Sequence, residues 1–187
     1  MKKAKTKKTT AKKKTTKTKS APKSSAKQVA NKAKVMVGKA VPDFSILATG
    51  DKTVRLKDLK GKAIVLYFYP KDSTPGCTLE GQDFSRLYPS FQKENAEVYG
   101  ISRDSLKSHE NFKAKQNYCI DLLSDESEEL CKIFGVVKMK NMYGRQVRGI
   151  ERSTFVIAAD GRLMKEWRGV KVDGHAQEVL DFVKSLN

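Results

Sequence analysis

The residue with the clearest potential for chemistry is Cys77. A continuous apolar run, Ala63 to Tyr69, ends at Pro70 and predicts a buried strand, and helical spacing resumes after the cysteine. Cys77 should therefore lie on the first turn of a helix. There, backbone N–H groups without intrahelical partners and the aligned peptide dipoles favour a negative charge on sulfur. We expect Cys77 to be a nucleophilic thiolate.

A helix end alone does not activate a thiol at neutral pH. It contributes only about 1 to 2 kcal/mol toward the charged form, so a cation must lie nearby. Arg152 opens a later predicted strand and is the candidate, because a guanidinium stays charged and offers a planar fork of donors. Thr74 precedes Cys77 by three residues and can place a hydroxyl between the sulfur and a substrate. Pro70 and Pro75 stiffen the loop that carries these groups.

Strands and helices alternate along the rest of the chain. Apolar patterns and turn residues predict two hairpins and one further strand: Phe44–Ala48 with Thr53–Leu56, Val98–Ser102, and Thr154–Ala159 with Arg162–Trp167. Helical spacing predicts four helices: from Cys77 to Phe91, from a cap at Asp104 or Ser105 to about Tyr118, from a capping box at Asp125 and Glu128 to Gly135, and from Ala176 to Leu186. This order predicts an α/β fold with a central mixed sheet and helices on both faces.

The first 37 residues differ from the rest in charge. Fifteen of the 38 basic residues fall in residues 1–42, before the first acidic residue, Asp43, while the remainder carries 23 basic and 21 acidic residues. Lys, Thr, Ala and Ser dominate residues 1–34, which have too little apolar surface to offset the entropy lost on ordering. We predict a disordered Lys-rich tail over residues 1–37 and a folded domain over residues 38–187.

The tail has the composition of a polyanion-binding segment. Residues 11–19 resemble the Lys-rich tails of linker histones, which act as polycations on DNA; the lysines concerned are Lys12, Lys13, Lys14, Lys17 and Lys19. Such a segment binds phosphates without reading bases. A solubilising or targeting extension is an alternative. The lack of Arg and Leu disfavours a mitochondrial presequence, whereas a plastid transit peptide stays open.

We expect neither a membrane span nor a secretory signal. No apolar stretch approaches the roughly 18 residues that a span needs, and the N-terminus lacks an apolar run. Three widely spaced cysteines form neither a disulfide framework nor a metal-ligand pattern, in line with a reducing compartment. The sequence therefore predicts a soluble intracellular protein, cytoplasmic, whose tail would allow nucleoid or nuclear association.

The order Pro70-x-x-x-Thr74-x-x-Cys77, followed much later by Arg152-Ser153-Thr154-Phe155, closely resembles the peroxiredoxins. Three strings look like the peroxiredoxin Q group, also called bacterioferritin comigratory protein: TPGCT at residues 74–78, LLSD at 122–125 and NMYG at 141–144. The resemblance spans about residues 38–187. It implies a thioredoxin-like fold and thiol-dependent reduction of hydrogen peroxide and organic hydroperoxides in antioxidant defence. It also implies a reaction without metal, haem or another cofactor, in a group whose members are often monomers.

The resemblance also implies a mechanism. The Cys77 thiolate would attack the terminal peroxide oxygen, release water or an alcohol, and become a sulfenic acid. Thr74, Arg152 and backbone N–H groups would stabilise the charge that moves along the O–O bond. Pro70 would belong to the same loop motif.

Regeneration is where the sequence departs from the commoner pattern of this group. Resolving cysteines are usual five residues after the peroxidatic one or on the helix after the next strand, positions that here hold Gln82 and Lys113. Cys119 could approach Cys77 only if the first helical turn unwinds, and Cys131 lies on an apolar stripe typical of core. We favour a one-cysteine cycle in which thioredoxin, glutathione or another external thiol reduces the sulfenate.

Two other function classes compete with the peroxidase. A DNA-associated nucleoid or chromatin protein with a redox-sensing thioredoxin-like domain is the alternative that the tail suggests. A disulfide oxidoreductase is disfavoured, because such enzymes need Cys-x-x-Cys and the residue three after Cys77 is Glu80. His109 and His175 are expected at the surface or as solvated helix caps rather than as acid–base groups.

Overall fold

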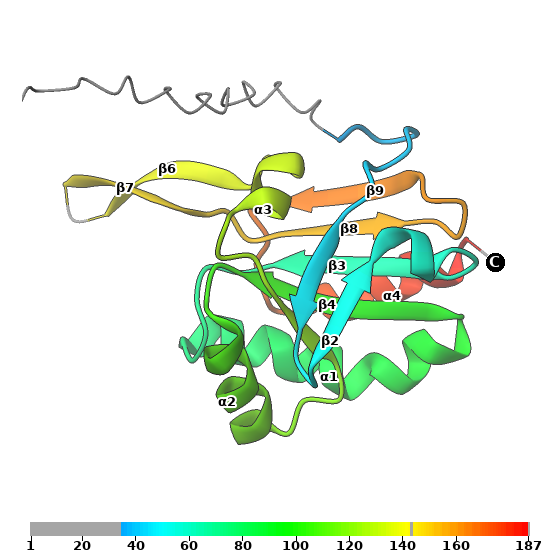
Figure 1. The fold of residues 1–187 in the computed structure, drawn as a ribbon, viewed down its shortest axis with the longest axis horizontal. Helices are drawn as coiled ribbons and strands as arrows, with labels where there is room; N and C mark the ends of the chain where they lie inside the picture. The colour runs from blue at the N-terminus through cyan, green and yellow to red at the C-terminus, as the bar shows by residue number, and fades with distance from the viewer. Residues whose placement is uncertain (1–34, 143, 187) are drawn as a thin grey trace, which may run out of the picture. The chain divides into compact units, whose positions relative to one another are not determined.

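The structure, a computed structural model, describes residues 35–142 and 144–186 (Figure 1). Residues 1–34 of the predicted disordered tail, with the lysines named above, lie outside the described residues. Val35 is already part of the core with 7% exposure, and its N–H donates to the Ile133 carbonyl at 3.3 Å. Packing against the domain therefore begins three residues before the predicted boundary at residue 38.

A seven-stranded mixed sheet forms the centre of the domain (Figure 1). Its strands are β1 (Ser45–Ala48), β2 (Lys52–Arg55), β3 (Ala63–Phe68), β4 (Ala96–Ser102), β5 (Asp121–Ser124), β8 (Ser153–Ile157) and β9 (Leu163–Arg168). They lie in the order β2–β1–β5–β4–β3–β8–β9. The β3–β4 and β4–β5 pairs are parallel, and the other four pairs are antiparallel. The mixed sheet predicted from the sequence is confirmed.

Helices cover both faces of this sheet. They are α1 (Pro75–Lys93), α2 (Leu106–Gln116), α3 (Glu129–Ile133), α4 (His175–Lys184) and a short 3₁₀ helix, η1 (Leu56–Leu59). Side chains of α1, α2 and α4 form one core against the sheet, and those of α3 and η1 belong to the other. A two-stranded ribbon, β6 (Val137–Met142) with β7 (Arg145–Ile150), extends away from the sheet (Figure 1). No helix within the described ranges is long and apolar enough to cross a membrane.

Strand β3 is buried on both faces, which explains its uninterrupted apolar sequence. Ile64, Leu66 and Phe68 point into the core that contains α3, whereas Val65 and Tyr67 point into the core that contains α1. Each of these five residues is at most 2% exposed. A slip of this strand by one residue would move each side chain into the opposite core, which is packed around a different set of side chains. Its carboxyl end is therefore a fixed point from which the next loop starts.

Helix α1 begins as the sequence predicts, with Thr74 as its N-cap and Pro75 at its first position. Tyr118, from the loop after α2, holds this end of the helix, because its hydroxyl donates to the Thr78 carbonyl at 2.9 Å. The tyrosine ring lies over Gly81, where a β-carbon would sit 2.5 Å from Tyr118 Oη and 2.6 Å from Cζ. Only glycine leaves room for this ring, so Gly81 allows the loop to pack on the helix.

Asp125 and Glu128 do not form the predicted capping box. Glu128 is the N-cap of α3 with a φ of 57°, and its side chain makes no capping hydrogen bond because it binds two arginines of other segments. Asp125 alone caps the helix, accepting from the N–H groups of Leu130 at 3.2 Å and Cys131 at 2.7 Å. The prediction was wrong because the acid three residues along is used in tertiary ion pairs.

We expect Gly81→Ala to destabilise the fold by about 1 to 3 kcal/mol, because the new methyl group must displace the Tyr118 ring. Urea unfolding at neutral pH measures this loss. Lys93→Ala, at an exposed position of the same helix, is the control and should change stability by less than about 0.5 kcal/mol. A Gly81→Ala protein as stable as the control would show that Tyr118 is not held at this position.

Candidate active site

Cys77 lies on the first turn of α1, at the edge of the sheet where β3 ends. It is 2% exposed, and its sulfur accepts a hydrogen bond from Arg152 Nη2 at 3.3 Å. Arg152 reaches it because β8 pairs antiparallel with β3, placing Ser153 opposite Phe68. The residue before β8 and the loop after β3 therefore meet at one edge of the sheet. The structure brings together the cysteine and the arginine that the sequence singled out.

A buried carboxyl group, Glu80, completes this cluster. It lies one helical turn after Cys77, is 1% exposed, and its Oε2 accepts a hydrogen bond from Arg152 Nη1. Burial raises the pKa of Glu80 to about 7, although the charge and hydrogen bond of Arg152 act in the opposite direction. The other oxygen, Oε1, is buried with no hydrogen-bond partner among the described residues. One guanidinium thus joins a carboxylate to the cysteine sulfur.

Sequence reasoning missed Glu80 as part of the site, although its spacing carried a signal. It lies three residues after Cys77 and four before Phe84, on the face of α1 that is buried against the sheet. An acid at such a position cannot stay charged without a partner. The need for a cation from another segment could have linked Glu80 to Arg152 before the fold was known.

Thr74 and Pro70 lie on the loop as predicted, but the hydroxyl of Thr74 does not bond to the sulfur. Thr74 Oγ1 donates to the Lys71 carbonyl at 3.0 Å, and no hydrogen bond among the described residues joins it to Cys77. The threonine therefore closes the loop on itself in this structure. Pro70 has no N–H to donate and follows Tyr69, whose N–H makes a bond to the Ile101 carbonyl at 3.0 Å.

Both histidines are buried, which corrects the expectation of surface positions. His109 is fully buried and lies between Asp72 and the Leu123 carbonyl. His175 is 5% exposed; its Nε2 lies 2.8 Å from Thr154 Oγ1, and burial lowers the pKa of its imidazole. The sequence of α2 is polar, but the helix turns one narrow face, which includes His109, toward the sheet. Neither histidine contacts Cys77 through a described hydrogen bond.

The other two cysteines are separated from Cys77. Cys131 is completely buried, burial raises its pKa, and the prediction that it belongs to the core is confirmed. Cys119 is exposed, and its N–H donates to Ser85 Oγ at 2.7 Å. Ser85 lies eight residues after Cys77 on α1, which is about 12 Å along the helix axis. The described structure therefore has all three cysteines as free thiols.

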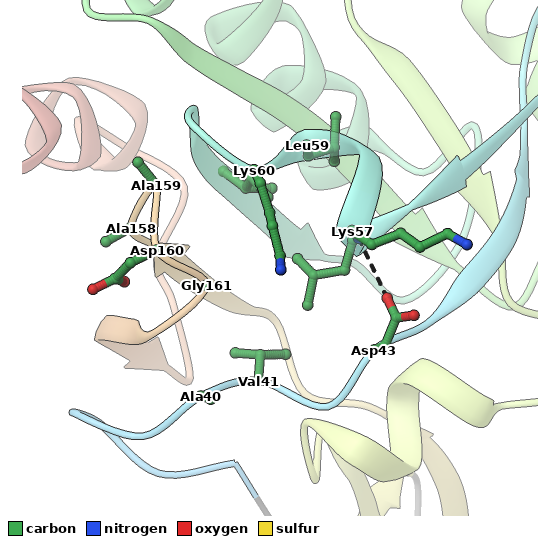
Figure 2. Close-up of a pocket in the computed structure, with 12 residues that line it drawn as sticks. Ala40, Val41, Asp43, Lys57, Leu59, Lys60, Ala158, Ala159, Asp160 and Gly161 are labelled. Carbon is green, nitrogen blue, oxygen red and sulfur yellow. Dashed lines mark hydrogen bonds between the residues drawn. The ribbon is translucent and has the colours of Figure 1, made fainter.

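A cavity of about 330 Å³ lies at the opposite end of β3, near Ile64 (Figure 2). Its floor is apolar, and Lys57, Lys60, Asp43 and Asp160 stand around it (Figure 2). None of the residues predicted to carry chemistry lines this cavity. Within residues 35–142 and 144–186, no cluster of three or more His, Cys, Asp or Glu side chains is arranged to hold a metal ion. Among the described residues, Arg152 and Glu80 are the charged side chains that hydrogen bonds join to Cys77.

Residues 37–166 match the AhpC/TSA family. Peroxiredoxin Bcp of Xanthomonas campestris is 52% identical over 143 residues, which cover 76% of this chain and 89% of that protein. Peroxiredoxin Bcp of Bacillus subtilis is 46% identical over 153 residues, which cover 82% of this chain and 98% of that protein. The solved structure of the Xanthomonas campestris bacterioferritin comigratory protein, studied for its alkyl peroxide reduction activity, is similar with a TM-score of 0.76 and 49% identity, covering 81% of this chain and 97% of that chain.

We expect Glu80→Gln to change how stability depends on pH. Because the pKa of Glu80 is raised to about 7, the folded protein holds this proton at a pH where the unfolded chain has lost it. The stability that the proton contributes is fully present below the unfolded pKa and is lost as the pH rises through 7. Between pH 5 and pH 8 the wild type should therefore lose on the order of 2 to 3 kcal/mol more than the variant.

Urea unfolding of both proteins at the two pH values measures this difference. Glu126→Gln, which removes an exposed carboxylate, is the control and should have the pH dependence of the wild type. Equal pH dependence in Glu80→Gln and wild type would contradict the raised pKa.

Proposed function

Because the chain belongs to the AhpC/TSA family and is a peroxiredoxin, a thiol-dependent peroxidase, we propose that Cys77 is its peroxidatic residue and that Arg152 activates it. Its described residues have the thioredoxin-like peroxiredoxin fold. The observation that carries the proposal is the hydrogen bond of 3.3 Å from Arg152 Nη2 to Cys77 Sγ, at a buried helix start. A guanidinium and the N-terminal turn of α1 together stabilise a thiolate.

The reaction begins with attack of the Cys77 thiolate on the terminal oxygen of the hydroperoxide. An S–O bond forms as the O–O bond breaks, the leaving oxygen takes a proton to become water or an alcohol, and sulfur is oxidised to a sulfenic acid. Arg152 and the free N–H groups of the first turn stabilise the negative charge on the leaving oxygen. Thr74 joins them once its hydroxyl turns from the Lys71 carbonyl toward the substrate.

Both hydrogen peroxide and organic hydroperoxides are substrates in this proposal. The Xanthomonas campestris bacterioferritin comigratory protein, 49% identical, is the relative whose alkyl peroxide reduction was studied. The thiolate attacks only the terminal –O–OH unit, which the two classes share. The sequence of steps above therefore applies to either substrate.

Regeneration proceeds through an external thiol, such as thioredoxin or glutathione. The thiol attacks the sulfenic acid, water leaves, and a mixed disulfide forms; a second thiol then releases the Cys77 thiolate and carries away the disulfide. The structure supports this one-cysteine cycle through the position of Cys119, about two helical turns from Cys77 along α1. Gln82 and Lys113 stand at the two positions where the resemblance to the peroxiredoxin Q group leads us to expect a resolving cysteine.

We further propose that the chain is an intracellular monomer and that its tail contacts DNA non-specifically. Fourteen lysines and no acid within residues 1–34 support the contact with DNA, since such a segment releases counterions from phosphates. The relatives give no support to the alternative hypothesis, a DNA-associated protein whose redox domain only senses. The tail would place a peroxidase near nucleic acid rather than replace its activity.

We expect Cys77→Ser to abolish hydroperoxide turnover with a thiol donor, because the nucleophile is removed. Cys119→Ser is the matched control and should retain turnover within about twofold, because Cys119 is not needed in a one-cysteine cycle. Mass spectrometry after one equivalent of peroxide should locate one added oxygen on Cys77. An active Cys77→Ser protein would end the peroxidase assignment of this residue, and a Cys77–Cys119 disulfide would overturn the one-cysteine cycle.

The DNA contact predicts salt-sensitive binding of duplex DNA by the full-length chain. Residues 35–187 should bind at least tenfold more weakly at low salt, because the truncation removes 14 positive charges. Fluorescence anisotropy with a labelled duplex, repeated at several salt concentrations, measures both affinities. Equal binding by the two proteins would remove the tail from the proposal and leave the peroxidase unaffected.

A further inference from the structure

A largely buried cluster of polar side chains contacts the loop that leads from β3 to Cys77. At its centre, His109 Nδ1 lies 3.0 Å and 3.1 Å from the two carboxyl oxygens of Asp72. The other ring nitrogen, Nε2, lies 3.1 Å from the Leu123 carbonyl oxygen in β5. His109 is 0% and Asp72 6% exposed, so water does not share these contacts. The histidine therefore spans from the loop to the sheet.

The partners of this histidine determine how many protons it shares with Asp72. A carbonyl oxygen only accepts, so His109 Nε2 must carry a hydrogen. A second hydrogen must lie between Nδ1 and the carboxyl group, because two bare acceptors would repel each other at 3 Å. The Tyr69 and Ser108 hydroxyls each donate to Asp72 at 2.7 Å. With three donors around it, the carboxyl group is best satisfied as an anion.

The hydrogen bonds of Asp72 also bear on where the second hydrogen lies. A carboxyl group that accepts from two hydroxyls and an imidazole is best satisfied without a proton of its own, which favours that hydrogen on His109. Burial acts to raise the pKa of Asp72, but the hydrogen bonds from His109, Ser108 and Tyr69 oppose it, so that the pKa lies below its usual value. With hydrogens on both ring nitrogens, His109 would form a buried imidazolium–carboxylate ion pair with Asp72.

Asp72 belongs to the short loop on which Pro70 and Thr74 also lie. Its own N–H donates to Asp104 Oδ2 at 2.9 Å, which ties the backbone of the loop to the turn after β4. The next residue, Ser73, has a φ of 58°, in the left-handed region that non-glycine residues rarely adopt. Such a backbone persists only when its surroundings hold it. The contact of Asp72 with His109 is one of those that hold this loop, together with the hydrogen bonds from Tyr69 and Ser108.

We propose that His109, as a buried imidazolium, is a positioning residue of the peroxidase reaction: it anchors Asp72 and thereby holds the loop that sets Cys77 against Arg152. His109 acts through the loop and touches neither sulfur nor guanidinium. The inference rests on the proposed role of Cys77. It adds a second buried ion pair, on α2, to the one that Arg152 and Glu80 form beside the sulfur.

The protonation state can be observed directly. In ¹⁵N-labelled full-length protein at pH 7, we expect both ring nitrogens of His109 to show the chemical shifts of a protonated imidazolium, with the resonances assigned by their loss in His109→Gln. His175, whose pKa burial lowers, is the internal reference and should be neutral at this pH. A single protonated nitrogen on His109 would overturn the proposal.

The effect of His109 on the reaction is measured as the rate constant for oxidation of Cys77 by hydrogen peroxide. His109→Gln keeps a donor of similar size but no charge, and we expect it to slow oxidation on the order of ten- to a hundredfold through a misplaced loop. His175→Gln is the matched control, because it makes the same change at another buried histidine, and it should stay within about twofold of wild type. Urea unfolding establishes that each variant is folded.

A double-mutant cycle tests whether His109 acts through Asp72. Asp72→Asn should slow oxidation to a similar extent, and the double variant should lose little more than either single one. Losses that multiply would overturn the coupling, as would a His109→Gln protein with the wild-type rate constant. If the wild type forms no sulfenic acid at Cys77, the proposed function fails. If the wild type forms it and the His109 and Asp72 variants form it at the same rate, only the positioning role fails.

Discussion

The antiparallel pairing of β8 with β3 is the constraint on which the site depends. It places Ser153 opposite Phe68, so that the residue before one strand meets the loop after the other. A shift of this register by one residue would turn Arg152 toward the other face of the sheet. The register cannot shift easily, because both faces of β3 are buried in separate cores. The distance between a guanidinium and a sulfur is thus set by packing that lies several residues away from both.

The guanidinium of Arg152 is shared by two buried groups that both gain from a cation. Glu80 holds one of its nitrogens and so fixes the plane of the fork, while the other nitrogen faces Cys77. A carboxylate near a thiolate also lowers the positive potential there, which is a cost for the sulfur. Burial raises the pKa of Glu80 to about 7, and the charge of Arg152 offsets only part of that rise. Glu80 thus orients the Arg152 guanidinium but weakens the positive potential that this side chain creates at the sulfur.

Much of this arrangement could be predicted from the sequence, because it depends on local patterns. The strand before Pro70, the helix start at Cys77 and both hairpins follow from apolar spacing and turn residues. What the sequence did not reveal depends on contacts between distant segments. The four-residue strand β5 is too short to show a period, and β6 and β7 pair only with each other, outside the main sheet. His109 looks like a solvated polar residue until Asp72 is placed beside it, whereas the spacing of Glu80 marks a buried acid whose partner, Arg152, comes from a distant segment.

The burial of Cys77 has a consequence for the order of events in a catalytic cycle. Cys77 is only 2% exposed. In the proposed cycle, a small oxidant that enters the site would react with the sulfur in this arrangement, whereas reduction by a protein thiol would need the first turn of α1 to open. The surroundings proposed to activate the sulfur would thus also separate oxidant from reductant by size. In that cycle the local stability of a few residues would set how fast reduction follows oxidation.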